Sequence, residues 1–116
     1  MAWQAKHRFA RISARKARLV VDVIRGQQVD RAFAFLRHSK KGVAPDILKL
    51  LRSAVANTEN GPDGALVDTE DVYVYRAAVD CGPSLKRIRP APQGRAFPVL
   101  KRQCHVTLEL ATRARK

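Results

Sequence analysis

Residues 81–108 read CGPSLKRIRPAPQGRAFPVLKRQCHVTL and connect two segments in which apolar and polar side chains alternate. The connection carries six basic residues, several prolines and no acidic residue. This pattern predicts one very long β-hairpin. A hairpin of this kind has almost no core of its own, because an isolated two-stranded ribbon is marginally stable in water. We therefore expect a partner outside the protein to hold it, and its charge indicates that this partner is negative.

The charge of the whole chain is large and clustered. Lys and Arg number 23 against 10 Asp and Glu, a formal net charge of +13. From Met1 to Val21 the chain has no acid and carries these cations: Lys6, Arg8, Arg11, Arg15, Lys16 and Arg18. Half of the acids fall between Glu59 and Asp71. Such a charge disfavours a compact monomer through self-repulsion, and it favours nucleic acid as the partner over an anionic membrane surface.

The remaining segments predict a single α+β domain over residues 1–116. Alternating or β-branched segments predict strands at Trp3–Phe9, Val72–Asp80 and Cys104–Leu110, with Phe9 on the buried face of the first. Helical spacing predicts three helices: one between Ser13 as N-cap and Gly26 as C′, one over Asp30–Arg37, and one over Ala44–Thr58. In the first of these helices, Leu19, Val20, Val23 and Ile24 form the apolar stripe expected in the core. We expect a small three-stranded antiparallel sheet with three helices on one face and a long protruding β-hairpin.

The hairpin, called the arm from here on, spans about residues 82–103. Its expected tip is Pro90, Ala91, Pro92, Gln93 and Gly94, because Pro presets turn torsions and Gly tolerates a positive φ. Each limb has about ten residues and would project roughly 30 Å. Its cations are Lys86, Arg87 and Arg89 on one limb and Arg95, Lys101 and Arg102 on the other. An ordinary solvated loop is the alternative, and six cations without an acid argue against it.

Several blocks of the chain resemble, in order and spacing, the bacterial large-subunit ribosomal protein twenty-two family. The blocks are Ala5–Arg8, Ser13–Val20, Ile24–Gly26, Ala54–Asn57, Gly82–Arg87, Gly94–Ala96 and Lys101–Thr107. The resemblance is collinear from Ala5 to about Leu110. It implies an α+β domain on the outer surface of the large ribosomal subunit, with a hairpin that passes through large-subunit rRNA to the wall of the peptide exit tunnel.

The resemblance also implies the partners of the protein. They are large-subunit rRNA, neighbouring ribosomal proteins and the nascent polypeptide in the tunnel, with a part in early assembly and a tip near the region where macrolides bind. The tip departs from the family pattern, in which arginine and a second basic residue follow the proline. Here Pro90 is followed by Ala91-Pro92-Gln93, so two positive charges are missing and the tip electrostatics should differ.

We expect both basic segments to neutralise RNA phosphates, while the shape of the folded RNA supplies specificity. We expect a cytoplasmic, ribosome-bound protein that is not a homo-oligomer. No run approaches the ~20 apolar residues that would span a bilayer, so we expect no membrane association.

The sequence gives little indication of a disulfide, a metal site or a catalytic site. Symmetric closure of the hairpin about Pro92 and Gln93 would pair Cys81 with Cys104, which we expect to be neighbouring but reduced thiols. With His105 they offer at most three metal ligands and no CxxC pair, so we expect no metal and no cofactor. Neither GxSxG, HExxH nor a phosphate-binding glycine loop is present, and we expect no enzymatic activity.

Two other classes stay open on the residues alone. A helix-turn-helix DNA-binding protein could use Arg15–Arg25, Gly26 and the helix from Asp30, but that second helix is mostly Ala, Phe and Leu, as in a core. A basic ribonuclease would need histidines or carboxylates that converge on a cleft, and His7, His38 and His105 are scattered.

Overall fold

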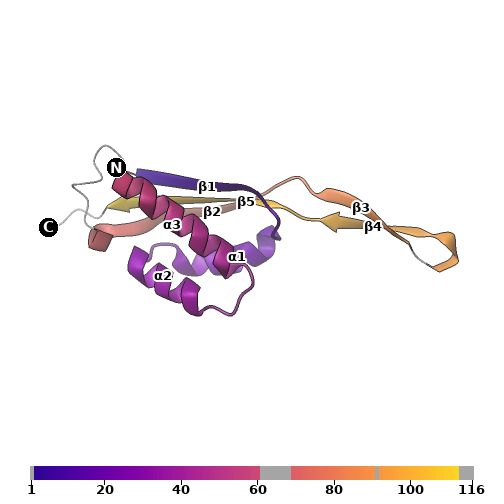
Figure 1. Cartoon of the computed structure of the whole chain (residues 1–116), viewed down its shortest axis with the longest axis horizontal. Helices are drawn as coiled ribbons and strands as arrows, with labels where there is room; N and C mark the ends of the chain where they lie inside the picture. Colours follow the sequence, from indigo (N-terminus) through magenta and orange to yellow (C-terminus); the bar gives the residue numbers. More distant parts are fainter. Residues whose placement is uncertain (1, 61–68, 91, 113–116) are drawn as a thin grey trace.

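A computed structural model describes residues 2–60, 69–90 and 92–112 of the chain (Figure 1). Residues 61–68 of the acidic stretch, Ala91 of the tip and the basic residues from 113 onward lie outside these ranges. Three antiparallel strands form the main sheet in the order β1 (Ala2–Ala10), β5 (Cys104–Thr112), β2 (Val72–Cys81). The helices are α1 (Ala14–Ile24), α2 (Val29–His38) and α3 (Ala44–Asn60).

The three helices lie on one face of the sheet, and the prediction of an α+β domain with a protruding hairpin is confirmed (Figure 1). Helix α1 packs on β2, α3 packs on β1 and β5, and α2 packs on α3. A 3₁₀ turn, η2 (Thr69–Asp71), leads into β2. The central strand β5 supplies the middle of the core, because its inward residues Cys104, Val106, Leu108 and Leu110 are fully buried. Burial of each such aliphatic side chain stabilises the fold by about 1.5–3 kcal/mol.

Strand β1 ends differently from the prediction. Phe9 was expected on the buried face, but its side chain is 51% exposed and Ala10 is buried instead. The pairing with β5 shifts register between His7 and Ala10, and Phe9 has a φ of 58°. A bulge of this kind adds one residue and reverses the alternation beyond it. The prediction for Phe9 is therefore wrong, because the alternation ends at the bulge.

Helix α1 begins and ends where the sequence indicated, but its buried stripe is shifted around the helix. Ser13 is the N-cap residue, although its side chain makes no capping hydrogen bond, and Gly26 follows the helix with a φ of +79°. Val20 and Ile24 are buried as expected, whereas Leu19 and Val23 are 58% and 47% exposed. The buried face instead runs through the small residues Ala14 and Ala17, which let the helix approach β2, so Leu19 and Val23 lie on its uncovered flank.

The arm is a separate two-stranded sheet of β3 (Leu85–Pro90) and β4 (Ala96–Lys101), closed by a short turn, η3 (Pro92–Gly94). Gly94 has the expected positive φ, 71°, and Gln93 shares that conformation at 66°. The molecule extends 69 × 27 × 18 Å with a radius of gyration of 17.6 Å. A compact chain of this length would have about 13 Å, so the arm projects well beyond the domain (Figure 1).

The register of the arm differs from symmetric closure by one residue. Cys81 pairs with Cys104, as predicted, but further out Leu85 pairs with Lys101 and Pro90 with Ala96. The shift arises between the two ladders, where residues 82–84 on one side face only residues 102–103 on the other. Because side chains alternate faces along a strand, one extra residue decides which residues of the two limbs share a face.

Candidate nucleic-acid interface

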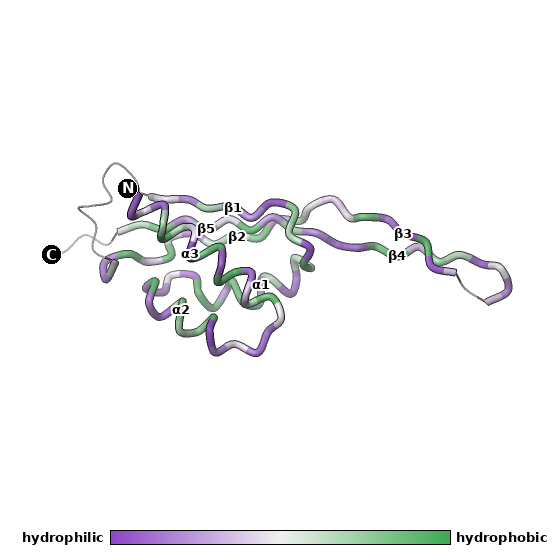
Figure 2. Tube along the Cα trace, viewed as in Figure 1, coloured by the Kyte–Doolittle hydropathy of each residue, from purple (hydrophilic) through white to green (hydrophobic). Residues whose placement is uncertain are grey.

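The arm has no core. Every described residue of β3 and β4 is exposed or half-buried, and Ile88 and Phe97 are 76% and 57% exposed. Hydrophilic and hydrophobic segments alternate along both limbs (Figure 2). A ribbon with this much exposed apolar surface and so little internal packing lacks the burial that would hold it in place. The expectation that the arm contributes little core of its own is therefore confirmed.

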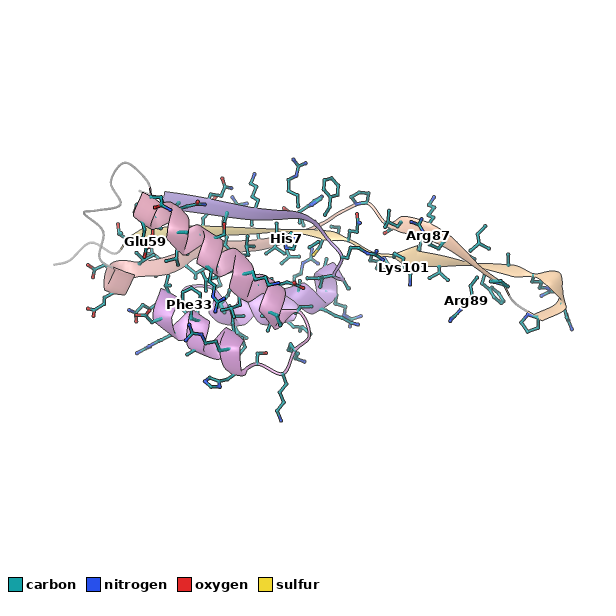
Figure 3. All side chains as sticks on the ribbon, viewed as in Figure 1. His7, Phe33, Glu59, Arg87, Arg89 and Lys101 are labelled. Atoms are coloured by element: carbon teal, nitrogen blue, oxygen red, sulfur yellow. The ribbon has the colours of Figure 1, made fainter. Side chains whose placement is uncertain are left out.

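The observed register distributes the cations unequally over the two faces of the arm. Directly opposed residues of an antiparallel pair project to the same face. Arg87, Arg89 and Lys101 therefore share one face with Val99 and Phe97. These three cations, whose side chains are labelled in Figure 3, also line a hollow of about 290 Å³ along the arm, together with Val99 and with Ile88 and Pro90 of β3. The opposite face is mainly apolar, and its residues are Lys86, Ile88, Pro90, Ala96, Pro98 and Leu100.

The arm cations have no acidic partner among the described residues. The two ion pairs in this part of the chain join Arg25 to Asp22 and Arg76 to Glu109, both in the domain. Arg87 donates from Nη1 to the backbone carbonyl oxygen of Lys86 at 2.8 Å, which leaves its charge uncompensated. Arg95 lies beside the turn at the tip and Arg102 lies in the link at the base. All six charges of the arm are thus available to an anion.

The N-terminal cations fall into two groups. Lys6 and Arg8 are exposed on β1, and the Arg8 guanidinium lies 5.5 Å from the centre of the Phe9 ring. Arg11 follows the strand, and Arg15, Lys16 and Arg18 belong to the first turns of α1. These side chains are exposed, so their predicted role in RNA binding is compatible with their positions and stays a prediction.

Arg18 has an additional structural task that sequence reasoning missed. Its Nε and Nη2 donate to the carbonyl oxygen of Val79 at 3.3 and 3.0 Å. About two helical turns later, Arg25, the C-cap residue of α1, donates from Nε and Nη2 to the carbonyl oxygen of Ala77 at 3.1 and 2.7 Å. The guanidinium groups of Arg18 and Arg25 therefore satisfy two backbone carbonyl groups of β2, the strand at the edge of the sheet. Left unpaired, such carbonyl groups could pair with a strand of another chain. The seven-residue spacing of the two arginines is the only signal of this in the sequence.

The base of the arm is closely packed around His105. The backbone N–H of Phe9 donates to His105 Nδ1 at 2.9 Å, and the two rings meet edge to face with centroids 4.8 Å apart. A Cβ added to Gly82 would lie 3.2 Å from His105 Nε2. The imidazole of His105, on β5, thus contacts both the bulge in β1 and the first link of the arm. Sequence reasoning did not foresee this contact.

The predicted pairing of the two cysteines is confirmed. Cys81 and Cys104 are paired in the sheet and both are free thiols, the first exposed and the second buried. Burial raises the pKa of the Cys104 thiol above its ordinary value of 9.0, the neighbouring Cys81 adds to the rise, and Arg18 opposes it. Among the described residues no cluster of three or more His, Cys, Asp or Glu could hold a metal ion. No helix in this part of the chain is long and apolar enough to cross a membrane.

Acidic side chains gather at the other end of the molecule. Asp30, Glu70 and Asp71 line a hollow of about 460 Å³ beside the start of α2. Glu59, near the end of α3, also lies at the end of the domain away from the arm (Figure 3). These acids therefore lie at the opposite end of the described protein from the cations of the arm.

Comparison with known proteins identifies the family. Residues 5–111 match the family model described as ribosomal protein L22p/L17e. The chain is 44% identical over 110 residues to the large ribosomal subunit protein uL22 of Solibacter usitatus, an alignment that covers 95% of this chain and 96% of the relative. It is 43% identical to the uL22 of Clostridium novyi, with 98% of this chain and all of the relative covered. The uL22 of Koribacter versatilis is 46% identical over 96% of this chain and 68% of that relative.

These matches confirm the resemblance carried by the sequence blocks, and they extend over nearly the whole domain and both limbs of the arm. The chain therefore belongs to the ribosomal protein L22p/L17e family, and it is a structural, non-enzymatic protein bound to the ribosome in the cytoplasm.

Proposed function

We propose that this protein is a constituent of the large ribosomal subunit that binds large-subunit rRNA through two basic surfaces. One is the N-terminal segment from Lys6 to Arg18, and the other is the arm. The observation that carries the proposal is an arm without a core, with six cations and no acidic partner among the described residues. Its affinity comes mainly from phosphate neutralisation and the release of counterions.

Salt dependence tests the proposal directly. Each phosphate contact contributes about 0.7–0.9 to the slope of log K against log salt concentration. Replacing Lys86, Arg87 and Arg89 together by Gln should lower the slope for large-subunit rRNA by about two to three. A matched triple replacement of the exposed Lys40, Lys49 and Arg52, which lie outside both surfaces, should leave the slope almost unchanged. Equal slopes for the two triple variants would refute rRNA binding by the arm.

We further propose that the tip reaches the wall of the nascent-peptide exit tunnel. Pro92, Gln93 and Gly94 are exposed and uncharged, and they end the projecting part of a 69 Å long molecule. Together with Pro90 and Ala91 they would face the nascent polypeptide and the macrolide region. A photoreactive amino acid at Gln93, in ribosomes that hold a stalled nascent chain, should crosslink to that chain. Crosslinks only to components of the outer ribosomal surface would refute this placement.

Assembly and oligomeric state belong to the same proposal. A basic arm that orders only within RNA would bring rRNA segments together early in assembly, and neighbouring ribosomal proteins would contact the domain. We expect the isolated protein to be a monomer. Sedimentation at several concentrations tests this, and a concentration-dependent dimer would contradict it.

A helix-turn-helix function has little support. In α2, which would have to read the DNA, Ala32 and Leu36 are buried and Phe33 packs against the core. Such a helix cannot present that side to a major groove. At fixed salt, structured rRNA should therefore compete much better than duplex DNA of equal length.

A further inference from the structure

A hollow of about 440 Å³ lies where the arm leaves the domain. Three segments line it: the start of α1, the link after β2 and the link before β5. Its residues are Ser13, Ala14, Arg15, Arg18, Cys81, Gly82, Ser84, Arg102 and Gln103. Three of them are arginines and none is acidic. The hollows at the start of α2 and beside the loop before α3, in contrast, both contain carboxylates.

The arginines of this hollow are placed to bind an anion. The Arg18 guanidinium is fixed by its two hydrogen bonds to Val79, and its Nη2 lies 4.0 Å from Cys81 Sγ. No described residue accepts a hydrogen bond from its Nη1. Arg15 and Arg102 are exposed and have no partner in the described parts of the chain. A tetrahedral anion with several acceptor oxygens suits a hollow that three guanidinium-bearing residues line.

The same hollow spans the joint between the arm and the domain. The ladder of β2 and β5 ends at Cys81 and Cys104, and the ladder of β3 and β4 begins at Leu85 and Lys101. Between them one backbone hydrogen bond, from Gly82 N–H to the Gln103 carbonyl oxygen at 3.0 Å, crosses from link to link. So short a connection leaves the direction of the arm weakly held. A ligand bound by α1 and by Arg102 at once would hold both sides of the joint.

We propose that this hollow binds one phosphate group and that the bound phosphate fixes the direction of the arm relative to the domain. The inference rests on the proposed function, because rRNA would supply the phosphate as a phosphodiester. Free phosphate has the same chemistry and serves as a probe. Binding at the joint would set the angle at which the arm enters the RNA, whereas the cations along the arm only hold it there.

The first experiment uses the full-length, ¹⁵N-labelled protein and inorganic phosphate at constant ionic strength, with chloride as the reference anion. Phosphate should shift the amide signals of Ser13, Ser84 and Gln103 saturably. It should also raise the order of the β3 and β4 amides, measured by ¹⁵N relaxation, toward that of β5. Shifts spread evenly over all cationic surfaces, or an unchanged mobility of the arm, would overturn the proposal.

Two variants make the test specific. Arg102→Gln should weaken phosphate binding by about tenfold or more and leave the arm mobile. Arg52→Gln removes an exposed charge of α3 that does not line the hollow, and it should change neither measurement. Neither side chain has a partner among the described residues, so both variants should fold. Equal phosphate affinities for the two variants would refute the site.

A second experiment replaces free phosphate by large-subunit rRNA and separates the two proposals. Arg102→Gln should still bind, with the slope of log K against log salt reduced by about one. If the wild type binds rRNA and Arg102→Gln shows the same slope, the proposed phosphate site is refuted and the proposed rRNA binding stands. If the wild type does not bind rRNA, both proposals are refuted.

Discussion

Replacing Leu85–Leu100 by an Asn-Gly turn should leave the domain folded. No described residue of β3 or β4 is buried, and the core consists wholly of residues from the main sheet and the three helices. The links on either side, including the hydrogen bond from Gly82 to Gln103, would remain. An Asn-Gly pair provides the two positive φ values that a tight hairpin needs.

The size of the effect follows from two opposing terms. The deletion shortens the connection between Cys81 and Cys104 from about 22 residues to about eight, which lowers the entropy cost of loop closure by about 0.9 kcal/mol. Loss of the β3–β4 pairing works in the other direction, but such a ribbon is marginal by itself. The net change in the free energy of unfolding should stay within about 1 kcal/mol, or about 4–8 °C in Tm.

Urea unfolding followed by the fluorescence of Trp3 measures this change, because the only tryptophan lies on β1, far from the deletion. Leu108→Ala serves as the comparison, since this fully buried side chain should cost about 2–5 kcal/mol. Small-angle scattering should show the radius of gyration falling from 17.6 Å toward about 13 Å. Loss of a cooperative transition, or destabilisation as large as that of Leu108→Ala, would refute the view that the arm is independent of the core.

Three further predictions concern the packing of the domain. Arg25→Lys should lower the free energy of unfolding by about 1 kcal/mol, because one ammonium nitrogen replaces the two guanidinium nitrogens that donate to the Ala77 carbonyl of β2. Asp22→Asn breaks only an exposed ion pair and should change the free energy of unfolding by less than about 0.5 kcal/mol. Equal urea midpoints for the two variants would contradict this. Gly82→Ala should destabilise by about 1 kcal/mol because its Cβ would crowd the imidazole of His105, and the loss should largely disappear in a His105→Ala background, which a double-mutant cycle would reveal. Above pH 9.0 the wild type should lose stability relative to Cys104→Ala. The buried thiol, whose pKa is raised, stays protonated in the folded protein, whereas the exposed thiol of the unfolded chain ionises. Parallel pH profiles of the urea midpoint for the two proteins would contradict the burial argument.

Much of the architecture follows from local patterns. The alternation around Val106, Leu108 and Leu110 identifies β5 and its inward face, because strand periodicity is a property of the strand itself. The helical spacing around Ile47 and Leu51 identifies α3 for the same reason. Composition identifies the arm, since a basic, acid-free segment that lacks a continuous apolar face cannot belong to a core.

The errors occur where a residue depends on neighbours distant in the sequence. Phe9 continues the alternation of β1, yet the bulge that turns it outward depends on the pairing of that strand with β5. Leu19 and Val23 complete an apolar stripe, yet only the packing of α1 on β2 decides that they stay exposed. In the sequence Arg18 is indistinguishable from the other cations of the N-terminal segment. Its hydrogen bonds to Val79 form only when α1 packs on β2.

The sequence by itself determined the elements of the protein, its long basic hairpin and its family. These are properties of composition, periodicity and order along the chain, and no three-dimensional contact is needed to read them. The tertiary structure alone decided which cations share a face of the arm, how α1 closes the edge of β2, and which arginines meet at the joint. The physical reason is that side-chain direction alternates with every residue. One extra residue between the two ladders therefore changes all the partners beyond it, and only the folded pairing shows where that residue lies.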